Sequence, residues 1–383
     1  MHVLYVIDSL GVGGAELSLA TMAPHYAAAG VALDVAYLRE RAGLQGALRA
    51  AGADVLSLAG PGGRVGAIGR VARLIRARRP DLVHTTLFEA DVAGRIAAGL
   101  TRVPAVSSLV TVAYGTEQLG EPGLRRWKVR GAQVLDAATA RLAARFHAVT
   151  AHVAEQMGRR LRIPRDRIDV VPRGRDPGQL GVRSAARRAG ARASIGVGPD
   201  TPVVLAVGRQ QHAKGLDVLL EAFPAVLREH PTAHLIVAGP EGSQTPVLRE
   251  AVSRARLDGA VSFLGAREDV PELLCGADVF VLPSRREGLP GALLEAMALE
   301  TRVVATDIPG VREVLGDADA ARLVRVGDVP GLAAAIATAI AEPADAKGRT
   351  KLARARFLER FTADRMVEGM IELYSRVLRR RGP

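Results

Sequence analysis

The sequence predicts an α/β protein made of two doubly wound domains, each a parallel sheet with helices on both faces. Continuous apolar runs such as VLYVI (3–7) and VVLAV (203–207) are typical of strands buried on both faces of a parallel sheet. Segments of helical character alternate with such runs up to about residue 170, and the alternation starts again near residue 202. The length of 383 residues fits two domains of ordinary size.

The first domain is expected over residues 1–175. It opens with a strand, the glycine-rich turn GVGG (11–14) and a helix that closes at Gly30. The series continues with helices over 44–51 and 65–78, and with strands at VALDVAYL, ADVLSL, DLVHTTL, AVSSLV, RFHAVT and IDVVPRG. Strands that alternate with helices pair in parallel, so their carboxyl ends should lie at one edge of the sheet.

A linker is expected over 176–198, because this segment is rich in Gly, Arg and Ala and has no clean periodicity. The second domain is expected over 199–361, with strands at PVVLAV, AHLIVAGP, VSFLG, ADVFVLPS, RVVATD and ARLVRV. Doubly wound sheets bind ligands at the carboxyl ends of their strands, and it is there that this sequence keeps its glycines and charges.

The net charge of +12 comes from 52 basic and 40 acidic residues. Only four of the basic residues are lysines, and so strong an arginine bias beside abundant alanine and glycine indicates a GC-rich genome rather than a nucleic-acid surface. The excess is concentrated in residues 1–180, which carry 24 basic and 15 acidic side chains. This local positive charge bears on any acceptor that the first domain binds.

A single cysteine, Cys275, excludes an internal disulfide and fits a reducing compartment. The opening MHVLYVIDSLG has no basic n-region and no cleavage site, so no signal peptide is expected. No apolar run approaches the roughly 20 residues that a membrane span needs. A soluble, cytoplasmic protein is therefore expected.

Two cations and two glycines follow the first strand of the second domain. Gly208 and Arg209 come directly after PVVLAV, and Lys214 and Gly215 open the helix LDVLLEAF. A helix start offers free amides and a partial positive charge, and Gly215 lets the backbone approach a ligand closely. A guanidinium and an ammonium at this place suit a diphosphate, although a plain turn with solvated cations needs the same residue types.

Two glutamates bracket a helix start in SRREGLPGALLEAMALE (284–300). Glu287 precedes the turn Gly288-Leu289-Pro290, and Glu295 lies inside the helix that follows. Proline suits the first turn of a helix, where its missing N–H is not needed. A carboxylate can accept hydrogen bonds from the paired hydroxyls of a ribose or hexose, but this spacing alone also fits two ordinary exposed residues.

Taken in order, the strand ends of the second domain resemble those of a known enzyme family. They read GRQQHAKG (208–215), AGPEG (238–242), VSFLG (261–265), PSRREGLPGALLEAMA (283–298) and VVATDIPGVREV (303–314). This succession is similar to the C-terminal half of the retaining glycosyltransferases of family 4, or glycosyl transferases group 1, which have the GT-B fold. The likeness is close over about residues 200–316. Over the rest it is looser, with GVGGAE and IDVVPRG resembling the family's first glycine loop and closing strand.

The resemblance implies roles for the matching residues. Arg209 and Lys214 would neutralise the donor diphosphate, and Glu287 would face the donor sugar as the third catalytic group. Glu295 would hold the donor ribose. The whole donor site would comprise Gly13, Gly14, Gly208, Arg209, Lys214, Gly265, Glu287, Gly288, Leu289, Pro290 and Glu295.

The resemblance also implies the activity, that of a hexosyltransferase-like enzyme of carbohydrate biosynthesis. It would move a sugar from a nucleotide-diphosphate sugar to a hydroxyl acceptor with retention of the anomeric configuration. No Asp-x-Asp cluster precedes the site, so the two cations would replace a divalent metal, and no cofactor is expected. A C-terminal helix over about 362–383 would pack back on the first domain. The donor's base (UDP, GDP or ADP), its sugar, the acceptor (sugar, small molecule or lipid-linked) and the oligomeric state stay open.

The first domain departs from the family at one position. The family usually places a histidine beside the donor sugar, on a loop just after a strand, but no histidine occurs here between His84 and His147. Val110 or a neighbour stands at that position, where Thr111 or Tyr114 could supply a polar contact. His84 ends a strand, so it could either reach the cleft or be a structural histidine with satisfied hydrogen bonds.

Three other interpretations of the sequence compete with the transferase. GVGGAE lacks the G-x-G-x-x-G spacing of a dinucleotide fingerprint, and the acid about 20 positions later, Asp34, lies inside a strand, so a nicotinamide enzyme is not favoured. A sugar-nucleotide epimerase on the same fold would need acid and base residues that face the sugar. A basic protein that binds nucleic acid or a membrane surface is the alternative from another class.

The segment RRWKVR (125–130) joins four cations to the only tryptophan. Such a run fits either an interfacial helix on anionic lipid at the inner membrane face, or a solvated helix face with one packed aromatic. Nucleic-acid binding needs clustered cations interleaved with aromatics, and this is the one segment that fits, so no nucleic acid is expected as a partner.

Overall fold

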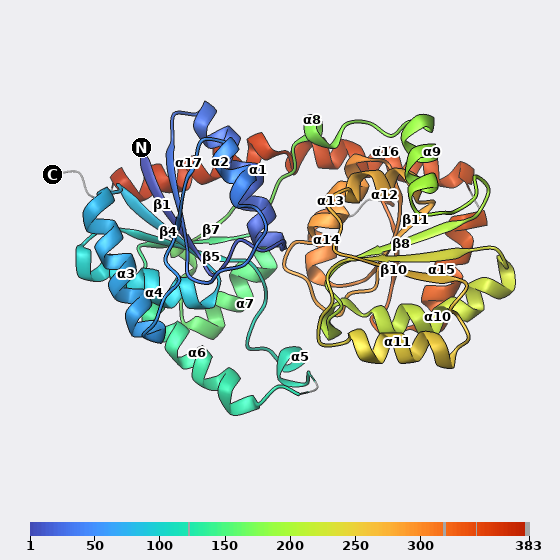
Figure 1. Ribbon diagram of the computed structural model, residues 1–383, viewed down its shortest axis with the longest axis horizontal. Helices are drawn as coiled ribbons and strands as arrows, with labels where there is room; N and C mark the ends of the chain where they lie inside the picture. Colours follow the sequence, from blue (N-terminus) through green and yellow to red (C-terminus); the bar gives the residue numbers. More distant parts are fainter. Residues whose placement is uncertain (122, 317–318, 342, 380–383) are drawn as a thin grey trace. The chain divides into compact units, whose positions relative to one another are not determined.

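The computed structural model describes residues 1–383 with the exception of 122, 317–318, 342 and 380–383. The chain folds into two compact units. The first unit comprises Met1–Asp176 and Thr362–Pro383, and the second comprises Pro177–Phe361. Both are parallel α/β structures, which confirms the predicted fold class (Figure 1).

The described part of the first unit holds a seven-stranded sheet in the order β3-β2-β1-β4-β5-β6-β7. Its strands are β1 His2–Ile7, β2 Ala32–Tyr37, β3 Asp54–Ser57, β4 Leu82–Thr86, β5 Ala105–Leu109, β6 Arg145–Ala148 and β7 Ile168–Val170. Its helices are α1 Gly14–Ala28, α2 Gln45–Ala50, α3 Gly63–Arg78, α4 Phe88–Thr101, α5 Thr116–Leu119, α6 Arg126–Ala140, α7 Ala151–Leu161, the 3₁₀ turn Arg165–Arg167 and α17 Ala363–Arg379.

Strand β1 shows why the sheet is covered on both faces. Val3, Tyr5 and Ile7 point into a core shared with α1, α2 and α17, whereas Leu4 and Val6 point into a second core shared with α3 and α4. Successive side chains of a strand alternate between faces, so a run that is apolar throughout can only be buried between two helical layers. Strand β1 is such a run.

The last helix belongs to the first unit. Helix α17 packs against α1, and Met370 and Tyr374 are fully buried in the core beneath it. Its apolar side chains recur at helical spacing, which gives α17 one buried face. The chain therefore leaves the first unit after Asp176 and returns to it at Thr362.

The described part of the second unit holds a six-stranded sheet in the order β10-β9-β8-β11-β12-β13. Its strands are β8 Val203–Val207, β9 His234–Ala238, β10 Val261–Gly265, β11 Val279–Leu282, β12 Arg302–Thr306 and β13 Arg322–Val324. Its helices are α8 Pro177–Leu180, α9 Ala185–Ser194, the 3₁₀ turn His212–Lys214, α10 Leu216–Glu229, α11 Thr245–Arg254, α12 Val270–Gly276, α13 Gly291–Ala298, α14 Pro309–Leu315, α15 Val329–Ala341 and α16 Pro343–Arg360. Helices α10, α11 and α15 cover one face, and α9, α12, α13 and α16 lie on the other (Figure 1).

The segment 176–198 is not the irregular linker that its composition indicated, because it contains helix α9. The side chain of Ser184 caps this helix by accepting from the amide of Arg187. Arg187 then pairs with Glu272 and Arg188 with Asp278, while the buried Arg192 donates to the carbonyl of Gly276. Ion pairs and hydrogen bonds attach α9 to the second unit, so an analysis of apolar periodicity could not detect it.

Candidate active site

The predicted donor residues of the second unit follow two strands that lie side by side at its centre. β8 and β11 are neighbours, but the chain continues from β8 to β9 on one side of this pair and from β11 to β12 on the other. Arg209 follows β8 closely, and the loop that begins with Pro283 follows β11. Doubly wound sheets bind ligands at such a switch point. The fold therefore places the predicted donor residues of the second unit at such a switch point.

Gly215 brings the two loops of this switch point into contact. Its φ angle of +64° lies in the left-handed region, and a Cβ atom here would lie 2.0 Å from the carbonyl oxygen of Pro283. Gly215 is also the N-cap of α10, so the start of this helix lies against the loop after β11. Only glycine tolerates both conditions, which explains its place directly after Lys214.

Lys214 and Glu287 form an ion pair across the switch point. The Nζ atom of Lys214 donates to Oε1 of Glu287 at 2.5 Å, and the hydroxyl of Ser284 donates to the same oxygen at 2.7 Å. Ser284 is fully buried, and its carbonyl accepts from the hydroxyl of Thr306 at 2.5 Å. The Glu287 side chain is only 10% exposed. The Glu287 carboxylate therefore holds the Lys214 ammonium in place. Ser284, which is itself bonded to Thr306 at the end of β12, fixes that carboxylate.

A second ion pair ties the same loops together. Both terminal nitrogens of Arg285 donate to the Asp217 carboxylate at 2.7 Å, and one also donates to the carbonyl of His212 at 2.9 Å. Burial is the largest single effect on the pKa of Asp217 and raises it, but the hydrogen bonds and the charge of Arg285, with smaller contributions from the backbone and His212, together lower that pKa. Sequence reasoning did not single out Ser284 or Arg285, whose role as a brace depends on contacts far along the chain.

The remaining predicted residues of the second unit lie along the same edge of the sheet. Gly208 follows β8, and Gly265 ends β10 with a φ angle of +66°. Leu289 is buried and precedes α13, and Glu295 lies about one turn inside that helix with its side chain partly exposed. Pro290 is the N-cap of α13 rather than a residue of its first turn, because the helix begins at Gly291.

Gly13 and Gly14 lie in the first unit, where they start helix α1. Gly13 is its N-cap and Gly14 its first residue. A Cβ atom at Gly14 would lie 2.9 Å from a terminal nitrogen of Arg173. The glycine loop and this arginine, which follows β7, are thus neighbours at the carboxyl edge of the first sheet.

A pocket lies beside this glycine loop, within the first unit. Its lining is partly apolar and partly polar, and it includes the histidines His84 and His147. The residues around it are Tyr5, Ala15, Ser18, Met22, His84, Thr86, Ser108, Val110, His147, Val149, Arg173 and Met366. Val110, which with its neighbours was expected to stand where the resemblance implies a histidine, is among them. The sequence pointed to His84 and Val110, but it gave no signal for Ser108 or Arg173.

The polar side chains of this pocket form a directed chain of hydrogen bonds. Nε2 of His147 faces the carbonyl of Val171 at 2.8 Å, so this nitrogen carries the proton and Nδ1 accepts from the hydroxyl of Ser108. The Ser108 oxygen then accepts from Nε2 of His84 at 2.7 Å, and Nδ1 of His84 accepts from the hydroxyl of Tyr374. His84 is thus a buried histidine with both ring nitrogens satisfied, one of the two roles that the sequence left open.

Burial keeps both histidines neutral, and this makes stability depend on pH. Burial lowers the pKa of His147 to about 4, against 6.5 for an unperturbed histidine. Between these two values the unfolded chain binds a proton that the folded chain does not, so stability falls as pH drops from 6.5 toward 4. We expect His147→Asn to remove about 2 kcal/mol of this dependence between pH 7 and pH 5.

Urea denaturation of the protein and of His147→Asn at pH 5, 6 and 7 measures this effect. The difference in unfolding free energy between the two proteins should shrink as the pH falls, since groups common to both cancel. A difference that stays constant across this range would show that His147 does not titrate as its burial requires.

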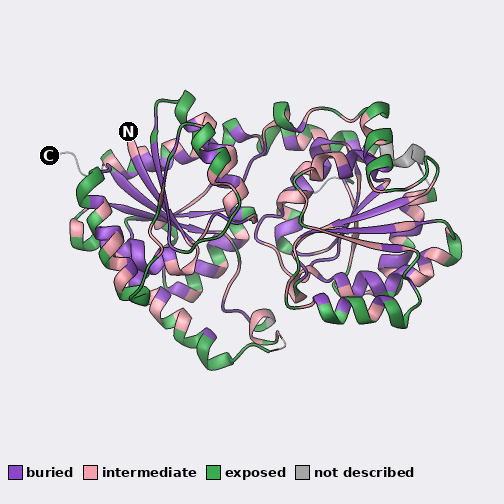
Figure 2. Cartoon of the chain, viewed as in Figure 1, coloured by how far each residue is buried: buried purple, intermediate pink, exposed green. Residues whose placement is uncertain are grey.

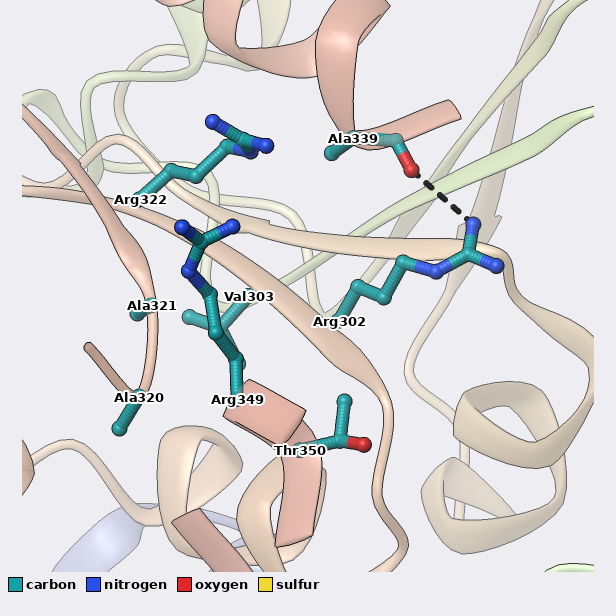
Figure 3. A pocket seen from close by; sticks show the side chains of 8 residues that line it. All are labelled: Arg302, Val303, Ala320, Ala321, Arg322, Ala339, Arg349 and Thr350. Carbon is teal, nitrogen blue, oxygen red and sulfur yellow. Dashed lines mark hydrogen bonds between the residues drawn. The ribbon is translucent and has the colours of Figure 1, made fainter. Parts of the chain in front are cut away.

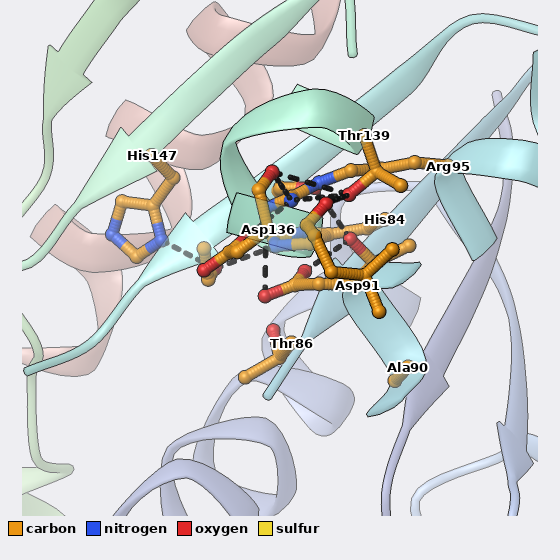
Figure 4. A network of polar contacts seen from close by, with 12 residues as sticks. His84, Thr86, Ala90, Asp91, Arg95, Asp136, Thr139 and His147 are labelled. Atoms are coloured by element: carbon orange, nitrogen blue, oxygen red, sulfur yellow. Dashed lines mark hydrogen bonds and ion pairs between the residues drawn. The ribbon is translucent and has the colours of Figure 1, made fainter. Parts of the chain in front are cut away.

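A buried ionic network lies next to the histidines (Figure 4). Arg95 is completely buried and donates to Oδ1 of Asp136 at 2.6 Å and to Ser107 at 2.8 Å. The hydroxyl of Tyr114 donates to the other oxygen of Asp136 at 2.8 Å. Tyr114, which the sequence offered as a polar substitute for the family histidine, is therefore engaged in this network. Burial raises the pKa of Asp91 to about 7, although Arg95 opposes the shift.

A second pocket, in the second unit, lies at the opposite edge of its sheet (Figure 3). Arg302 and Arg322 are the first residues of β12 and β13, and Arg349 reaches the pocket from α16. Arg302 donates to the carbonyl of Ala339 at 3.0 Å. Ligands of doubly wound sheets bind at the carboxyl edge, so this pocket is not the donor site despite its arginines.

Within the part of the chain that the structure describes, no three His, Cys, Asp or Glu side chains gather as a metal site would require. The same residues contain no helix that is long and apolar enough to cross a membrane.

The chain matches two models of known protein families and several characterised relatives. Residues 201–342 match the model of glycosyl transferases group 1, and residues 12–179 match that of glycosyltransferase family 4. The chain is 31% identical over 312 residues to D-inositol 3-phosphate glycosyltransferase of Nocardia farcinica, covering 78% of this chain and 67% of the relative. It is 33% identical over 319 residues to 2-deoxystreptamine N-acetyl-D-glucosaminyltransferase of Streptomyces fradiae, covering 79% and 72%.

Solved structures share the whole fold. Anabaena HepE in complex with UDP and glucose superposes with a TM-score of 0.84 at 23% identity, covering 97% of this chain and 99% of that one. WaaG, a glycosyltransferase of lipopolysaccharide biosynthesis, superposes with a TM-score of 0.78 at 16% identity, covering 97% and 99%. The fold is that of a GT-B glycosyltransferase. The chain belongs to glycosyltransferase family 4, the group 1 glycosyl transferases, and is a transferase. This confirms the resemblance and favours the transferase over the epimerase and the basic binding protein.

Proposed function

We propose that this transferase moves a sugar from a nucleotide-diphosphate sugar to a hydroxyl acceptor with retention of the anomeric configuration. The ion pair of Lys214 and Glu287 carries the proposal, because it holds a cation at the switch point of the second sheet, beside the start of α10. Solved structures of Anabaena HepE contain UDP with glucose, UDP alone, or UDP-glucose. These bound molecules support a donor of this class.

The proposed reaction uses the positive charge that is already fixed at the switch point. The bond between the anomeric carbon and the phosphate oxygen breaks, and its electron pair leaves with the nucleoside diphosphate. Arg209, Lys214 and the amides at the start of α10 stabilise the negative charge that develops, at about 3–4 kcal/mol for one good donor. The acceptor hydroxyl attacks the oxocarbenium-like carbon on the face that the phosphate leaves. Its proton passes to the departing phosphate oxygen, so no separate base is required.

The proposal assigns distinct tasks to the two glutamates. Oε1 of Glu287 already accepts from Lys214 and Ser284, so its Oε2 is the oxygen proposed to accept from a hydroxyl of the donor sugar. Glu295 accepts from the ribose hydroxyls of the nucleotide. The two cations take the place of a divalent metal ion. The free, buried thiol of Cys275 supports a reducing, cytoplasmic setting for the reaction.

Replacement of Glu295 by alanine tests this donor site. We expect UDP, GDP or ADP to raise the melting temperature of the unaltered protein, with one base preferred. Glu295→Ala should weaken binding of that nucleotide at least tenfold, because a hydrogen bond to a charged group contributes about 1.5–3 kcal/mol. The variant should also lose the preference for ribose over 2′,3′-dideoxyribose. Thermal shift and isothermal titration calorimetry measure both effects.

Glu250→Ala is the matched control, since Glu250 lies on α11 of the same unit and pairs only at the surface with Arg254. Its nucleotide affinity should equal that of the unaltered protein. Failure of every nucleoside diphosphate to protect against heat would contradict the donor site itself, whereas equal affinity in Glu295→Ala would contradict the role of Glu295 alone. Retention is tested separately, by NMR of the anomeric proton in the first product formed.

A further inference from the structure

Helix α6 presents an apolar stripe to solvent. Trp127 is 68% exposed and Val134 is 71% exposed, and Leu124, just before the helix, is 42% exposed. Residues 127, 131, 134 and 138 recur at intervals of four, three and four, so they lie on one side of the helix. The other two, Gly131 and Ala138, are also exposed. Figure 2 shows where exposed residues lie along the chain. A helix of a soluble protein normally turns charged or polar side chains outward, and α6 does the reverse along this line.

The opposite side of α6 is already occupied, so the stripe cannot be the helix's core face. Val129, Asp136, Thr139 and Ala140 are buried, and α6 packs against α4 and α7 of the first unit. Asp136 is fixed there by Arg95. Helix α6 therefore has one side packed within the unit and a separate apolar side in contact with solvent.

Cations flank the exposed stripe. Arg126 and Arg130 lie on one side of it and Lys128 on the other, as the helical positions require, and all three are exposed. Arg125 and Arg141 add exposed positive charge at the two ends of the helix. The one acidic residue of α6, Asp136, is buried on the far side. The face therefore combines net positive charge with an apolar centre.

We propose that this face, the α6 surface, docks onto an anionic lipid bilayer. The α6 surface comprises Leu124, Arg125, Arg126, Trp127, Lys128, Arg130, Gly131, Val134, Ala138 and Arg141. Trp127 and the neighbouring aliphatic side chains enter the interface between head groups and acyl chains, where tryptophan is favoured. The cations lie at the level of the phosphates, where each contributes to attraction by anionic lipid. A nucleic acid would satisfy the cations but would leave Leu124 and Val134 in water. This docking is independent of the donor chemistry.

The protein carries its own probe of this contact, because Trp127 is the only tryptophan of the chain. Full-length protein is titrated with vesicles of phosphatidylcholine containing 30% phosphatidylglycerol, and with vesicles of phosphatidylcholine alone. We expect a blue shift of the fluorescence, and quenching by brominated acyl chains, with the anionic vesicles. Binding to the neutral vesicles should be at least tenfold weaker, and added salt should weaken the anionic case.

Two variants separate the contributions of charge and apolar contact. Arg126→Glu/Lys128→Glu/Arg130→Glu should lower the partition coefficient at least tenfold, and Leu124→Ser/Val134→Ser should lower it several-fold while leaving Trp127 in place. Arg73→Glu/Arg76→Glu/Arg79→Glu is the matched control, since it makes the same charge change on exposed residues of helix α3 and its C-cap. The control should bind as the unaltered protein does.

Equal loss in the control would show attraction by net charge alone and would overturn the proposal. So would binding that both α6 variants retain, or a fluorescence shift with duplex DNA that equals the shift with anionic vesicles. Circular dichroism of each variant, with its melting temperature, shows that the proteins compared are folded.

Discussion

Replacement of Lys214 by alanine is expected to lower kcat/KM for a verified nucleotide-sugar donor by about 100- to 1,000-fold. The ammonium lies at the carboxyl edge of β8, fixed by Glu287 at 2.5 Å, and in the proposed reaction it offsets charge that appears only as the phosphate departs. The loss should therefore fall mainly on kcat, with a smaller change in KM, because the diphosphate gains charge in the transition state. Release of nucleoside diphosphate in a coupled assay measures both constants.

Two control variants show whether the loss of activity is specific to the side chain of Lys214. Lys351→Ala removes an exposed lysine of α16 and should leave kcat/KM unchanged. Lys214→Arg keeps the charge but changes its shape and reach, so it should recover only part of the activity. Removal of Lys214 also leaves Glu287 without its cationic partner, and melting temperatures show how far stability contributes. Near-normal turnover by a folded Lys214→Ala protein would contradict the proposed mechanism.

Most of the fold could be predicted from the sequence because apolar runs determine strands in a parallel sheet. Every strand expected from such a run is present. Strands and helices alternate in the first domain and from the start of the second, as expected. Helix α9 was missed because its attachment depends on arginines that pair with Glu272 and Asp278, about 85 to 90 positions away. Periodicity detects burial of apolar side chains, and an ion-paired helix does not show it.

The positions of the candidate site residues in the fold could also be predicted from the sequence. Strand ends and glycines placed Arg209, Lys214 and Glu287 at one edge of the sheet, as the structure has them. The sequence could not show that Lys214 and Glu287 touch, since their contact depends on Gly215 allowing two loops to approach. Nor could it show the braces Ser284 and Arg285, because serine and arginine in a loop are common and only tertiary contacts distinguish these two.

The polar interior of the first unit was the least predictable part, and Arg95 is its centre. Arginine inside a helix usually indicates an exposed position, yet Arg95 is 0% exposed. Its Nη1 donates to Asp136, its Nε donates to Ser107, and a third nitrogen lies 3.6 Å from the Asp91 carboxylate. The guanidinium also lies over the ring of Phe146, at 5.4 Å from its centroid. One positive charge thus compensates two buried carboxyl groups.

Replacement of Arg95 by methionine is expected to destabilise the first unit by about 3–5 kcal/mol, because removing one partner leaves the other charge buried and unpaired. Asp136 loses its cation, and Asp91, whose pKa burial already raises to about 7, becomes harder still to ionise. Arg95→Met/Asp136→Asn should cost less than the sum of the two single changes, since it removes the uncompensated charge as well. Urea denaturation followed by far-UV circular dichroism measures this.

The loss of stability in Arg95→Met should also depend on pH. The direction of that dependence distinguishes the loss of an ion pair from the loss of packing. Without Arg95 the raised pKa of Asp91 rises further, so lowering the pH protonates Asp91 and relieves its buried charge; the deficit of Arg95→Met should therefore be smaller at pH 5 than at pH 8. A cavity left by a shorter side chain would cost the same at both values. Arg76→Met, an exposed change on α3, should lie within about 0.5 kcal/mol of the unaltered protein. A deficit under about 1 kcal/mol for Arg95→Met would mean that water or a moved side chain already compensates the two carboxyl groups.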